Sequence, residues 1–548
     1  MSAGRLLAWS VAGGVLVQLA LWRFSEGRHF SYAFDYLLRV YDAHGNWALL
    51  GVAAAAWLLR GRPEALRLVR FAAERPWSLA LILLPLLCLG SRFVYHAYPL
   101  SYDELATAFQ AEAFAAGRLS GLWPPELIDR LVPTFMQGRF LTVSKVTGEI
   151  STSYWPAYAL YLTPFYWLGI PWAANPVLGA LTIPAVHRLA SRLGGSPEAG
   201  GWAVLLTLAS PVFVVTSISY YSMPAHLLLD LWFAVLLLDP TPRRALLAGV
   251  LGSIALTLHQ PARHIVFAAP FFAWLAFRPG SWRILLALVL GYLPLAALLG
   301  FGWQYHLAGL LAQNAGTAPQ SAGAAAVPSL PGARSAARVF LLPDFATLQA
   351  RAAGVTKIWT WGAMGLLVLA AWGYRAAADR VAARVLAASL GATFLVFFFV
   401  GTDQGHGWGN RSIHGAWFVL PVLAAVPLVR LDAAPLRAMA AWGLALSLVA
   451  ADGLRLLQVE SLIRAHLKQV PPLAIAPDPK LHEVVFVDPR HGVYSHDMVR
   501  NDPFLRGHRI VMILSPREPA EAVMARSFPR HVKVAEGPWG QRWVAPLR

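Results

Sequence analysis

At residues 98–105 the chain has the sequence Tyr98-Pro99-Leu100-Ser101-Tyr102-Asp103-Glu104-Leu105, directly after a strongly apolar run, Trp77–Phe93. Two adjacent carboxylates therefore follow within about ten residues of the end of a predicted membrane span. Carboxylates at that depth cost insertion free energy unless they lie in water or in a polar cavity. Two interpretations are open. Asp103 is a catalytic base at a membrane surface, or Ser101 and Asp103 cap a helix over Glu104–Ala116.

The composition indicates a polytopic helical membrane protein. Of the 548 residues, 57% are hydrophobic and only 13% are charged, whereas soluble domains have about 25% charged residues. Apolar runs long enough to span a bilayer recur as far as Leu456. The 22 Trp and 16 Tyr residues fit aromatic belts at membrane interfaces. The single cysteine, Cys88, excludes a disulfide framework and a cysteine-based metal site.

The net charge of +17 is carried mostly by arginine. In a membrane protein it indicates positive cytoplasmic loops and anionic-ligand sites, and we expect no nucleic-acid partner. The densest basic loop, Arg60–Arg75, predicts that this loop and the N-terminus are cytoplasmic. The first apolar run, Leu6–Trp22, has no small-residue cleavage site near its end and is interpreted as a retained anchor. Together with the Ala- and Arg-rich usage, this predicts a multi-pass protein of a bacterial inner (plasma) membrane.

The run Tyr154–Leu168 decides the number of spans. If it spans the membrane, the arginine-containing loops that follow face outward; if it does not, all of them are cytoplasmic. Pro156 and Pro164 also interrupt it, so we assign it to the first outer loop as a juxtamembrane helix. This gives about 13 spans and an outer C-terminus. The predicted spans are Leu6–Trp22, Gly45–Leu59, Trp77–Phe93, Ala173–Leu189, Trp202–Ile218, Met223–Leu238, Ala245–Leu258, Ile265–Phe277, Ile284–Phe301, Ile358–Trp372, Val381–Val400, Ile413–Val429 and Ala438–Leu456.

Three parts are expected. Residues 1–76 form two spans and the basic loop, and residues 77–456 form a helical transmembrane domain with outer loops at 94–172 and 302–357. Residues 457–548 are polar and form a small α/β domain outside the membrane. The evidence for it is a set of strand-like runs with one helix-like segment, namely Val484–Asp488, Arg509–Leu514, Glu518–Arg526, Val532–Val534 and Trp543–Val544. Within the first outer loop, Ser101–Ser151 predicts short amphipathic helices on the outer leaflet.

The predicted topology places many polar side chains on the outer face. They are Asp103, Glu104, Arg139, Lys145, His259, Arg263, Tyr305, His306, His406 and Arg411. Cations of this kind would neutralise a leaving lipid phosphate, and a carboxylate would remove the proton of an acceptor. The same inventory would serve a transporter or flippase of an anionic solute or lipid. Arg263 and Arg411 would also fit arginines that snorkel, and His306 and His406 would fit ordinary interfacial residues.

A series of short motifs resembles the GT-C superfamily of polytopic glycosyltransferases, and is most similar to bacterial relatives of protein O-mannosyltransferases and aminoarabinose transferases. The likeness covers Trp77 to about Arg430 and lies in the order and spacing of the motifs. In chain order they are Ser101–Glu104, Ser153–Tyr158, Asn175–Thr182, Ser191–Gly194, Leu208–Phe213, the glycines Gly249 and Gly252 with Thr257–Pro261, and Gly407–Arg411.

The resemblance implies a GT-C-like fold and an inverting transferase that uses a polyprenyl-phosphate-linked sugar as donor. Asp103 takes the base role by position, and Glu104 assists it, binds a metal, or only begins a helix. The resemblance implies Arg411 as the main group for the donor phosphate, assisted by Arg263, Lys145 and His306. The residues implied to line the substrate are Arg139, His259, Tyr305, Tyr154 and His406.

Two departures from the family pattern bear on the chemistry. The turn Ser219–Met223 lacks the second acid that members with metal sites often have, so no metal site is assigned and no cofactor is certain. Asn410 stands where a proline is common. The acceptor is a lipid, a glycan or a protein. A transporter should show internal repeats with discontinuous spans in two halves, and the sequence has no such repeat, which favours the transferase.

Overall fold

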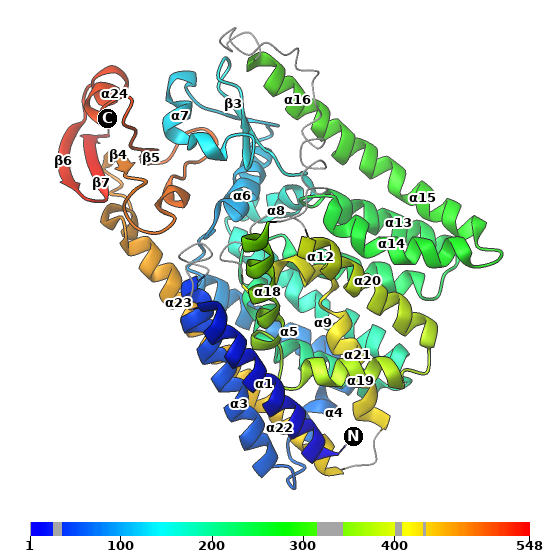
Figure 1. Cartoon of the computed structure of the whole chain (residues 1–548). Helices are drawn as coiled ribbons and strands as arrows, with labels where there is room; N and C mark the ends of the chain where they lie inside the picture. Colours follow the sequence, from blue (N-terminus) through cyan, green and yellow to red (C-terminus); the bar gives the residue numbers. More distant parts are fainter. Residues whose placement is uncertain (1, 26–34, 315–343, 400–407, 431–433, 548) are drawn as a thin grey trace. The chain divides into compact units, whose positions relative to one another are not determined.

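The computed structural model describes residues 2–25, 35–314, 344–399, 408–430 and 434–547, and the chain divides into two compact units. Unit 1 comprises Met1–Tyr95, Trp172–Ala297 and Arg334–Val459. Unit 2 comprises His96–Pro171, Leu298–Ala333 and Glu460–Arg548. Most of the predicted first outer loop and the C-terminal residues from Glu460 thus belong to one unit. Figure 1 labels the elements of both units.

Unit 1 is built of helices, because its long apolar runs satisfy their backbone groups only internally. Several helices begin with proline in the first turn, where its missing N–H costs no hydrogen bond. The helices are α1 Ala3–Ser25, η1 Leu37–Asp42, α3 Ala43–Leu58, α4 Leu66–Glu74, α5 Pro76–Leu89, η2 Gly90–Val94, α9 Ala174–Gly194, α10 Pro197–Leu208, α11 Pro211–Ser217, α12 Met223–Leu237, α13 Pro242–Thr257, α14 Ala262–Phe277, α15 Trp282–Leu295, α18 Phe345–Thr360, α19 Leu366–Ala376, α20 Arg380–Phe399, η8 Arg411–Ala416, α21 Val419–Arg430, α22 Ala434–Leu446 and η9 Ser447–Ala451. Helix α23, Asp452–Lys468, continues from η9, and η5 Pro171–Ala173 and η6 Ala296–Gly302 lie where the units adjoin along the chain.

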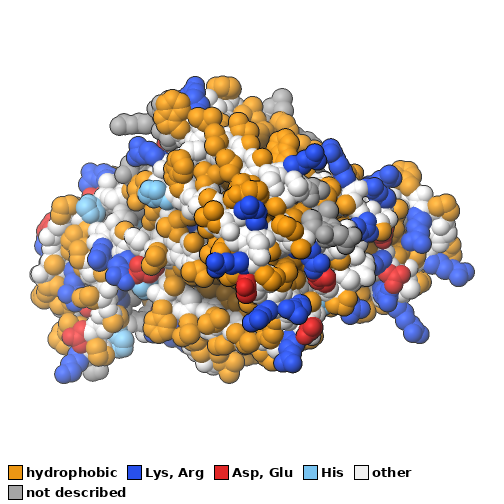
Figure 2. Space-filling view, turned by 90° about the horizontal axis from the view of Figure 1, so that it is seen from below, with side chains coloured by type: hydrophobic (Ala, Val, Ile, Leu, Met, Phe, Trp, Pro, Cys, Tyr) orange, Lys and Arg blue, Asp and Glu red, His pale blue; other side chains and the backbone are white. Residues whose placement is uncertain are grey.

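Five helices among the described residues are long and apolar enough to cross a membrane, or six if one bent pair is counted as a span. They are Ala3–Phe24, Pro76–Val94, Trp282–Gln313, Arg380–Phe399 and Ala434–Lys468. Large apolar side chains on α1 and α5 are exposed, as lipid-facing surfaces require. Figure 2 shows hydrophobic side chains spread over one face, with Lys and Arg among them. The chain is therefore a helical membrane protein, and the total of 13 spans stays a prediction.

Two predicted spans are not single straight helices. Trp202–Ile218 is the bent pair, α10 and α11, which meet at an angle of 70°. Pro211 lacks the N–H that would continue the helix, so the chain begins a new one there. Ile358–Trp372 breaks between α18 and α19, where Gly365 has φ +72°. The predicted span Ile284–Phe301 is longer than expected, because the helix continues to Gln313.

Unit 2 contains helices and two small sheets. Besides the expected short helices, the predicted first outer loop forms a three-stranded antiparallel sheet in the order β1-β3-β2. The sequence analysis missed this sheet, whose strands are only two to four residues long. The elements are α6 Tyr102–Ala115, β1 Gly121–Leu122, η3 Pro125–Leu127, α7 Ile128–Leu131, η4 Thr134–Met136, β2 Leu141–Val143, β3 Glu149–Thr152, α8 Ala157–Trp167 and α16 Trp303–Gln313. At about 1.5 Å per residue, the 11 residues of α8 are too short to cross a bilayer.

The C-terminal residues have the α/β structure that the sequence predicts. A four-stranded sheet has the order β5-β4-β7-β6, in which β4 and β5 are parallel and the other neighbours antiparallel. The parallel pair requires a crossover, residues 488–508, which carries η11. The elements are η10 Pro471–Ala474, β4 Leu481–Val487, η11 Ser495–Met498, β5 Arg509–Ile513, α24 Ala520–Ser527, β6 Val532–Gly537 and β7 Gly540–Pro546.

One hydrophobic core serves both parts of unit 2. Phe109 and Ile128 of the first outer loop are buried in the same cluster as Phe486 and Met512 of the C-terminal sheet. Trp123 adds a hydrogen bond from its indole N–H to the Asp502 carbonyl, 2.9 Å. Neither part buries its apolar face alone, which is why residues 457–548 are not a separate domain.

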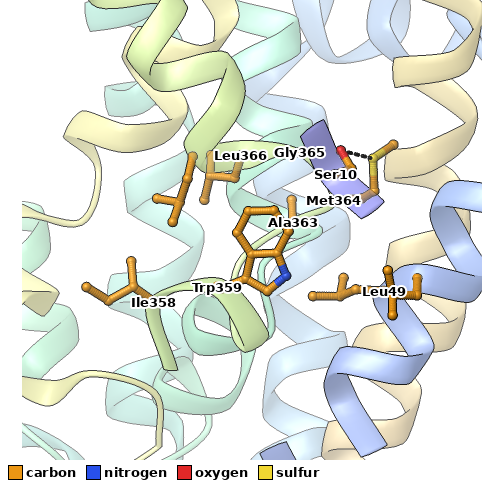
Figure 3. A pocket seen from close by; sticks show the side chains of 10 residues that line it. Ser10, Leu49, Ile358, Trp359, Ala363, Met364, Gly365 and Leu366 are labelled. Atoms are coloured by element: carbon orange, nitrogen blue, oxygen red, sulfur yellow. Dashed lines mark hydrogen bonds between the residues drawn. The ribbon is translucent and has the colours of Figure 1, made fainter. Parts of the chain in front are cut away.

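The N-terminal helices of unit 1 are fastened to α18 by close packing. Gly13 of α1 faces Trp359, whose ring lies so near that a Cβ on Gly13 would come within 2.3 Å of it. Figure 3 shows the adjoining crevice of about 10 Å³, lined by Ser10, Leu49, Trp359 and Met364 among others. The first helices of the chain are thus packed into the unit.

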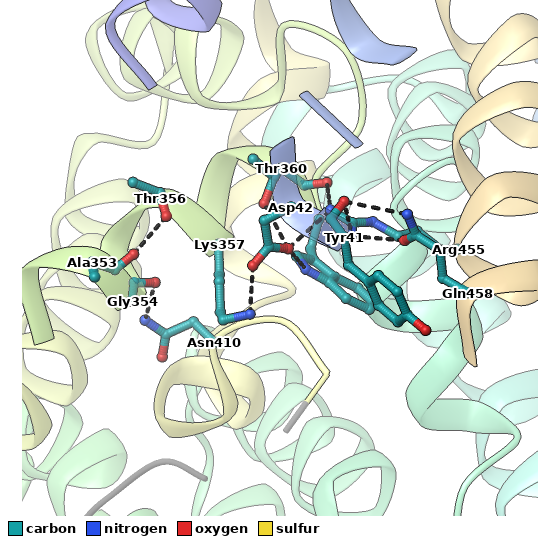
Figure 4. Close-up of polar contacts among 11 residues, drawn as sticks. Tyr41, Asp42, Ala353, Gly354, Thr356, Lys357, Thr360, Asn410, Arg455 and Gln458 are labelled. Carbon is teal, nitrogen blue, oxygen red and sulfur yellow. Dashed lines mark hydrogen bonds and ion pairs between the residues drawn. The ribbon is translucent and has the colours of Figure 1, made fainter. Parts of the chain in front are cut away.

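A buried ionic cluster joins the same helices (Figure 4). Asp42 accepts hydrogen bonds from Lys357 Nζ at 2.6 Å and from the Trp361 indole N–H at 2.6 Å. Its other cationic partner is Arg455, at 3.1 Å. Arg455 also donates to the carbonyls of Tyr41 and Thr360. All three charged side chains are buried, so one carboxylate is the counter-charge of two buried cations.

Asp42→Asn should lower the free energy of unfolding by about 3–5 kcal/mol, because Lys357 and Arg455 would remain buried without their counter-charge. Thermal unfolding of the purified protein in detergent measures the effect. Asp239→Asn is the control, since Asp239 pairs with Arg244 on the surface and should change the melting temperature little. Equal melting temperatures for wild type and Asp42→Asn would contradict the assigned role.

Candidate functional site

The structure separates the two interpretations of the acidic stretch. Ser101 is the N-cap of α6, and Glu104 completes a capping box with it. The Glu104 carboxylate accepts the backbone N–H groups of Leu100 at 2.8 Å and Ser101 at 3.0 Å, and it is fully buried. Helix capping is therefore done by Ser101 and Glu104. Asp103 lies in the first turn of the same helix.

The Asp103 carboxylate instead accepts a hydrogen bond from the phenol of Tyr154. Tyr154 follows β3 directly and is buried, with the Phe140 ring edge-on to its own ring at 6.2 Å. Two predicted site residues far apart in the sequence thus meet. The first turn of a helix also stabilises a negative charge. Asp103 is half-buried, and the Tyr154 phenol holds its carboxylate on one side.

The remaining predicted residues of unit 2 have other partners. Lys145 forms an exposed ion pair with Asp129 at 2.7 Å. His306 Nε2 lies 3.2 Å from the Ser120 hydroxyl and 3.1 Å from the Ser151 hydroxyl, between α16 and the first sheet. Tyr305 is largely exposed. Arg139 stacks on the Phe140 ring at 5.1 Å, and the Phe140 ring also contacts the Tyr154 ring.

Unit 1 brings together the two arginines proposed for a phosphate. Arg263, at the start of α14, donates to the backbone carbonyl of Arg411 at 3.1 Å. The Arg411 guanidinium lies over the Tyr221 ring at 4.3 Å. His259, at the break before α14, is buried in the same unit. His406 lies outside the described residues.

A polar cavity of about 10 Å³ adjoins Arg263, a volume that holds about one water molecule. His226 of α12 lines it, is 2% exposed and has no hydrogen-bond partner for either ring nitrogen among the described residues. Asp230, one turn further on, binds His264 Nδ1 at 2.6 Å, and His264 Nε2 lies 2.5 Å from the Tyr292 hydroxyl. Cations and histidines therefore outnumber carboxylates in this part of the helical unit.

Sequence reasoning missed several of these residues. His226 and Asp230 had a visible signal, because they stand four residues apart within a predicted span, where ionisable side chains are expensive. Asp497 of η11 had none. It is buried in unit 2 and interacts electrostatically with Asp103, Glu104 and Arg139. No motif marks it. Among the described residues, no group of three or more His, Cys, Asp or Glu side chains is arranged to hold a metal ion.

No protein-family model matches the chain, and no curated protein matches it in sequence. Two solved structures do resemble it in fold. The structure of ArnT from Cupriavidus metallidurans bound to undecaprenyl phosphate has a TM-score of 0.54 at 12% identity, covering 86% of this chain and 99% of that one. The apo structure of the same protein has a TM-score of 0.49 at 12% identity, covering 85% and 99%. The likeness to the first of these structures is one of fold.

Glu104→Ala should lower the free energy of unfolding by about 1–3 kcal/mol, because two backbone N–H groups would lose their acceptor in a buried place. Denaturant unfolding of the purified protein measures it. Glu126→Ala, an exposed carboxylate of the same loop, is the control and should unfold like the wild type. If both variants behave alike, the capping role of Glu104 is wrong.

Proposed function

We propose that this chain is a membrane glycosyltransferase that moves a sugar from a polyprenyl-phosphate donor to an acceptor on the outer face of the bacterial inner membrane. The observation that carries the proposal is the carboxylate of Asp103. It stands at the start of α6 just beyond a candidate span, beside the capping box of Ser101 and Glu104, and accepts a hydrogen bond from Tyr154. The shared fold with ArnT, whose solved structure holds undecaprenyl phosphate, supports a lipid-phosphate donor.

The proposed reaction is a direct displacement at the anomeric carbon. Asp103 removes the proton of the acceptor hydroxyl or amine, whose oxygen or nitrogen forms the new bond to that carbon. The bond between the anomeric carbon and the phosphate oxygen breaks, and the polyprenyl phosphate leaves with the bonding electrons. Attack opposite the leaving group inverts the configuration. Tyr154 holds the carboxylate in one orientation while the proton is transferred.

The leaving phosphate requires positive charge. We assign this role to Arg411 and Arg263, which are neighbours in unit 1 and whose planar guanidinium groups suit phosphate oxygens. Lys145 and His306 remain proposed helpers, and Arg139, His259, Tyr305 and His406 remain proposed lining residues. We further propose that the N-terminus is cytoplasmic, that unit 2 lies outside, and that the acceptor is a lipid, a glycan or a protein.

Asp103→Asn should lower turnover by about 10²–10⁴-fold, because the amide cannot accept the proton. The assay follows release of polyprenyl phosphate from a panel of polyprenyl-phosphate-linked hexoses and pentoses by the purified protein. Glu126→Gln, in the same loop and exposed, is the control and should keep wild-type turnover. Near-normal turnover of Asp103→Asn, with correct folding, would remove the base assignment.

Arg411→Ala and Arg263→Ala should each weaken donor binding by about 10-fold or more, through loss of a charge-assisted contact worth about 1.5–3 kcal/mol. Binding of undecaprenyl phosphate and the KM for the donor are the measurements. Arg278→Ala, at the other end of α14 and exposed, controls for loss of charge. An unchanged affinity in both variants would show that the phosphate binds elsewhere.

A further inference from the structure

We propose that Asp497, from the C-terminal part of the chain, is a positioning residue of the base site, a second carboxyl whose charge sets the proton affinity of Asp103. The inference rests on the proposed function, in which Asp103 is the base. It assigns the C-terminal sheet a part in the chemistry, since the crossover between β4 and β5 carries Asp497.

The crossover is bound directly to the residues that precede and begin α6. The Tyr102 hydroxyl donates to the Val499 carbonyl at 3.1 Å. Arg500 donates to the carbonyls of Pro99 and Leu100, the latter at 2.9 Å, and its guanidinium lies over the Tyr98 ring at 3.9 Å. Residues just after Asp497 are therefore hydrogen-bonded to residues just before Asp103.

The crossover is also fixed from its own side. The Asn501 side chain exchanges two hydrogen bonds with the backbone of Val511 in β5, each 2.8 Å long. Arg500 Nε donates to the Asp497 carbonyl at 2.6 Å. The Phe135 ring packs edge-on against His496 at 5.0 Å. These contacts leave Asp497 little freedom to move away from the stretch that carries Asp103.

Backbone strain is concentrated in the same two segments. Among the described residues, four that are not glycine have positive φ, and three of them are His96, Ala97 and Tyr494. The first two lead into Tyr98, and Tyr494 is the N-cap of η11. Such conformations cost about 1–3 kcal/mol each and persist where the surroundings enforce them, often at functional sites. The strain thus marks the junction that brings the two carboxyls together.

The charges around Asp497 do not neutralise it. The charged groups that face it are Arg500, Asp103, Glu104, Arg139 and His496. Two phenols also lie nearby, the half-buried Tyr98 and the buried Tyr102. The Arg500 guanidinium donates hydrogen bonds to three backbone carbonyls. The Asp497 carboxylate forms an ion-pair contact with Nε2 of the adjacent His496 at 3.5 Å. Burial raises the pKa of Asp497 to about 7; Arg500 and Arg139 oppose the rise, and Asp103 and Glu104 add to it.

The coupling has a defined sign. Below pH about 7, Asp497 is protonated and neutral, so it does not repel the negative charge of Asp103. Above that pH, the Asp497 carboxylate disfavours a second negative charge, and Asp103 binds a proton more strongly. A stronger base removes the acceptor proton faster, provided that it stays ionised. The kcat/KM should therefore rise between about pH 6 and 8.

The first arm of the test is the pH profile of transfer from the undecaprenyl-phosphate-linked sugar that supports turnover. Wild type should show an inflection near pH 7 with a rise of about 3–10-fold, which Asp497→Asn should lose and Asp497→Glu should restore. Glu112→Gln is the matched control, because burial also raises the pKa of Glu112 to about 7, although Asp502 and Arg506 are the charges beside it. An inflection that persists in Asp497→Asn, or vanishes in Glu112→Gln, overturns the proposal.

The second arm needs no turnover. In a Glu112→Gln background, infrared spectroscopy should show a carboxyl band that titrates near pH 7 and is absent from the variant that also carries Asp497→Asn. Adding Asp103→Asn to that background should lower the midpoint by about one unit, through loss of the like charge. An unmoved midpoint defeats the coupling even where transfer is confirmed. A shifted midpoint in a protein without transferase activity defeats the proposed function alone.

Discussion

A buried charge in an apolar helical unit must have its counter-charge from the same chain, and Asp42 supplies this for unit 1. Its carboxylate lies at the end of η1 and binds Lys357 of α18 and Arg455 of α23, which are separated by about a hundred residues of sequence and by several helices. The two N-terminal helices become part of the unit through this cluster and through the contact of Gly13 with Trp359. Lipid cannot solvate these groups, so the cluster fixes which helices are neighbours.

In unit 2 the equivalent constraint lies in the first turn of α6, where different side chains cap the helix and accept the Tyr154 hydrogen bond. Three polar residues stand together at the start of α6, and each would serve as a cap in isolation. Ser101 and Glu104 form the capping box, while the carboxylate of Asp103 accepts a hydrogen bond from the Tyr154 phenol. A reactive group placed on a capped helix is held by the helix axis and by a second element. That combination gives the proposed base a defined direction toward its substrate.

Elements could be predicted from the sequence where hydropathy, capping residues or β-branched runs determine them. The apolar run before Asp103, the cap expected at Ser101, and the β-branched runs that became β4 and β5 all identified their elements, whereas the sequence analysis named Asp103 and not Glu104 as the second capping residue. The order of weak motifs predicted the fold that the ArnT likeness confirms. The proline at 211 indicated a helix break, but the mean hydropathy of a window does not register a single proline. The short strands β1 to β3 and the approach of Asp497 to Asp103 depend on contacts between distant segments, which periodicity cannot show.

The shared core of unit 2 has a consequence for the order in which the protein is made. Phe109 and Ile128 are synthesised long before Phe486 and Met512, and most of the transmembrane helices are inserted in between. The loop that carries Asp103 therefore waits with an uncovered apolar face until the strands β4 and β5 arrive. Assembly of the base site becomes a late event with high contact order. A chain that ends before β4 and β5 would leave the loop that carries Asp103 without half of its hydrophobic core.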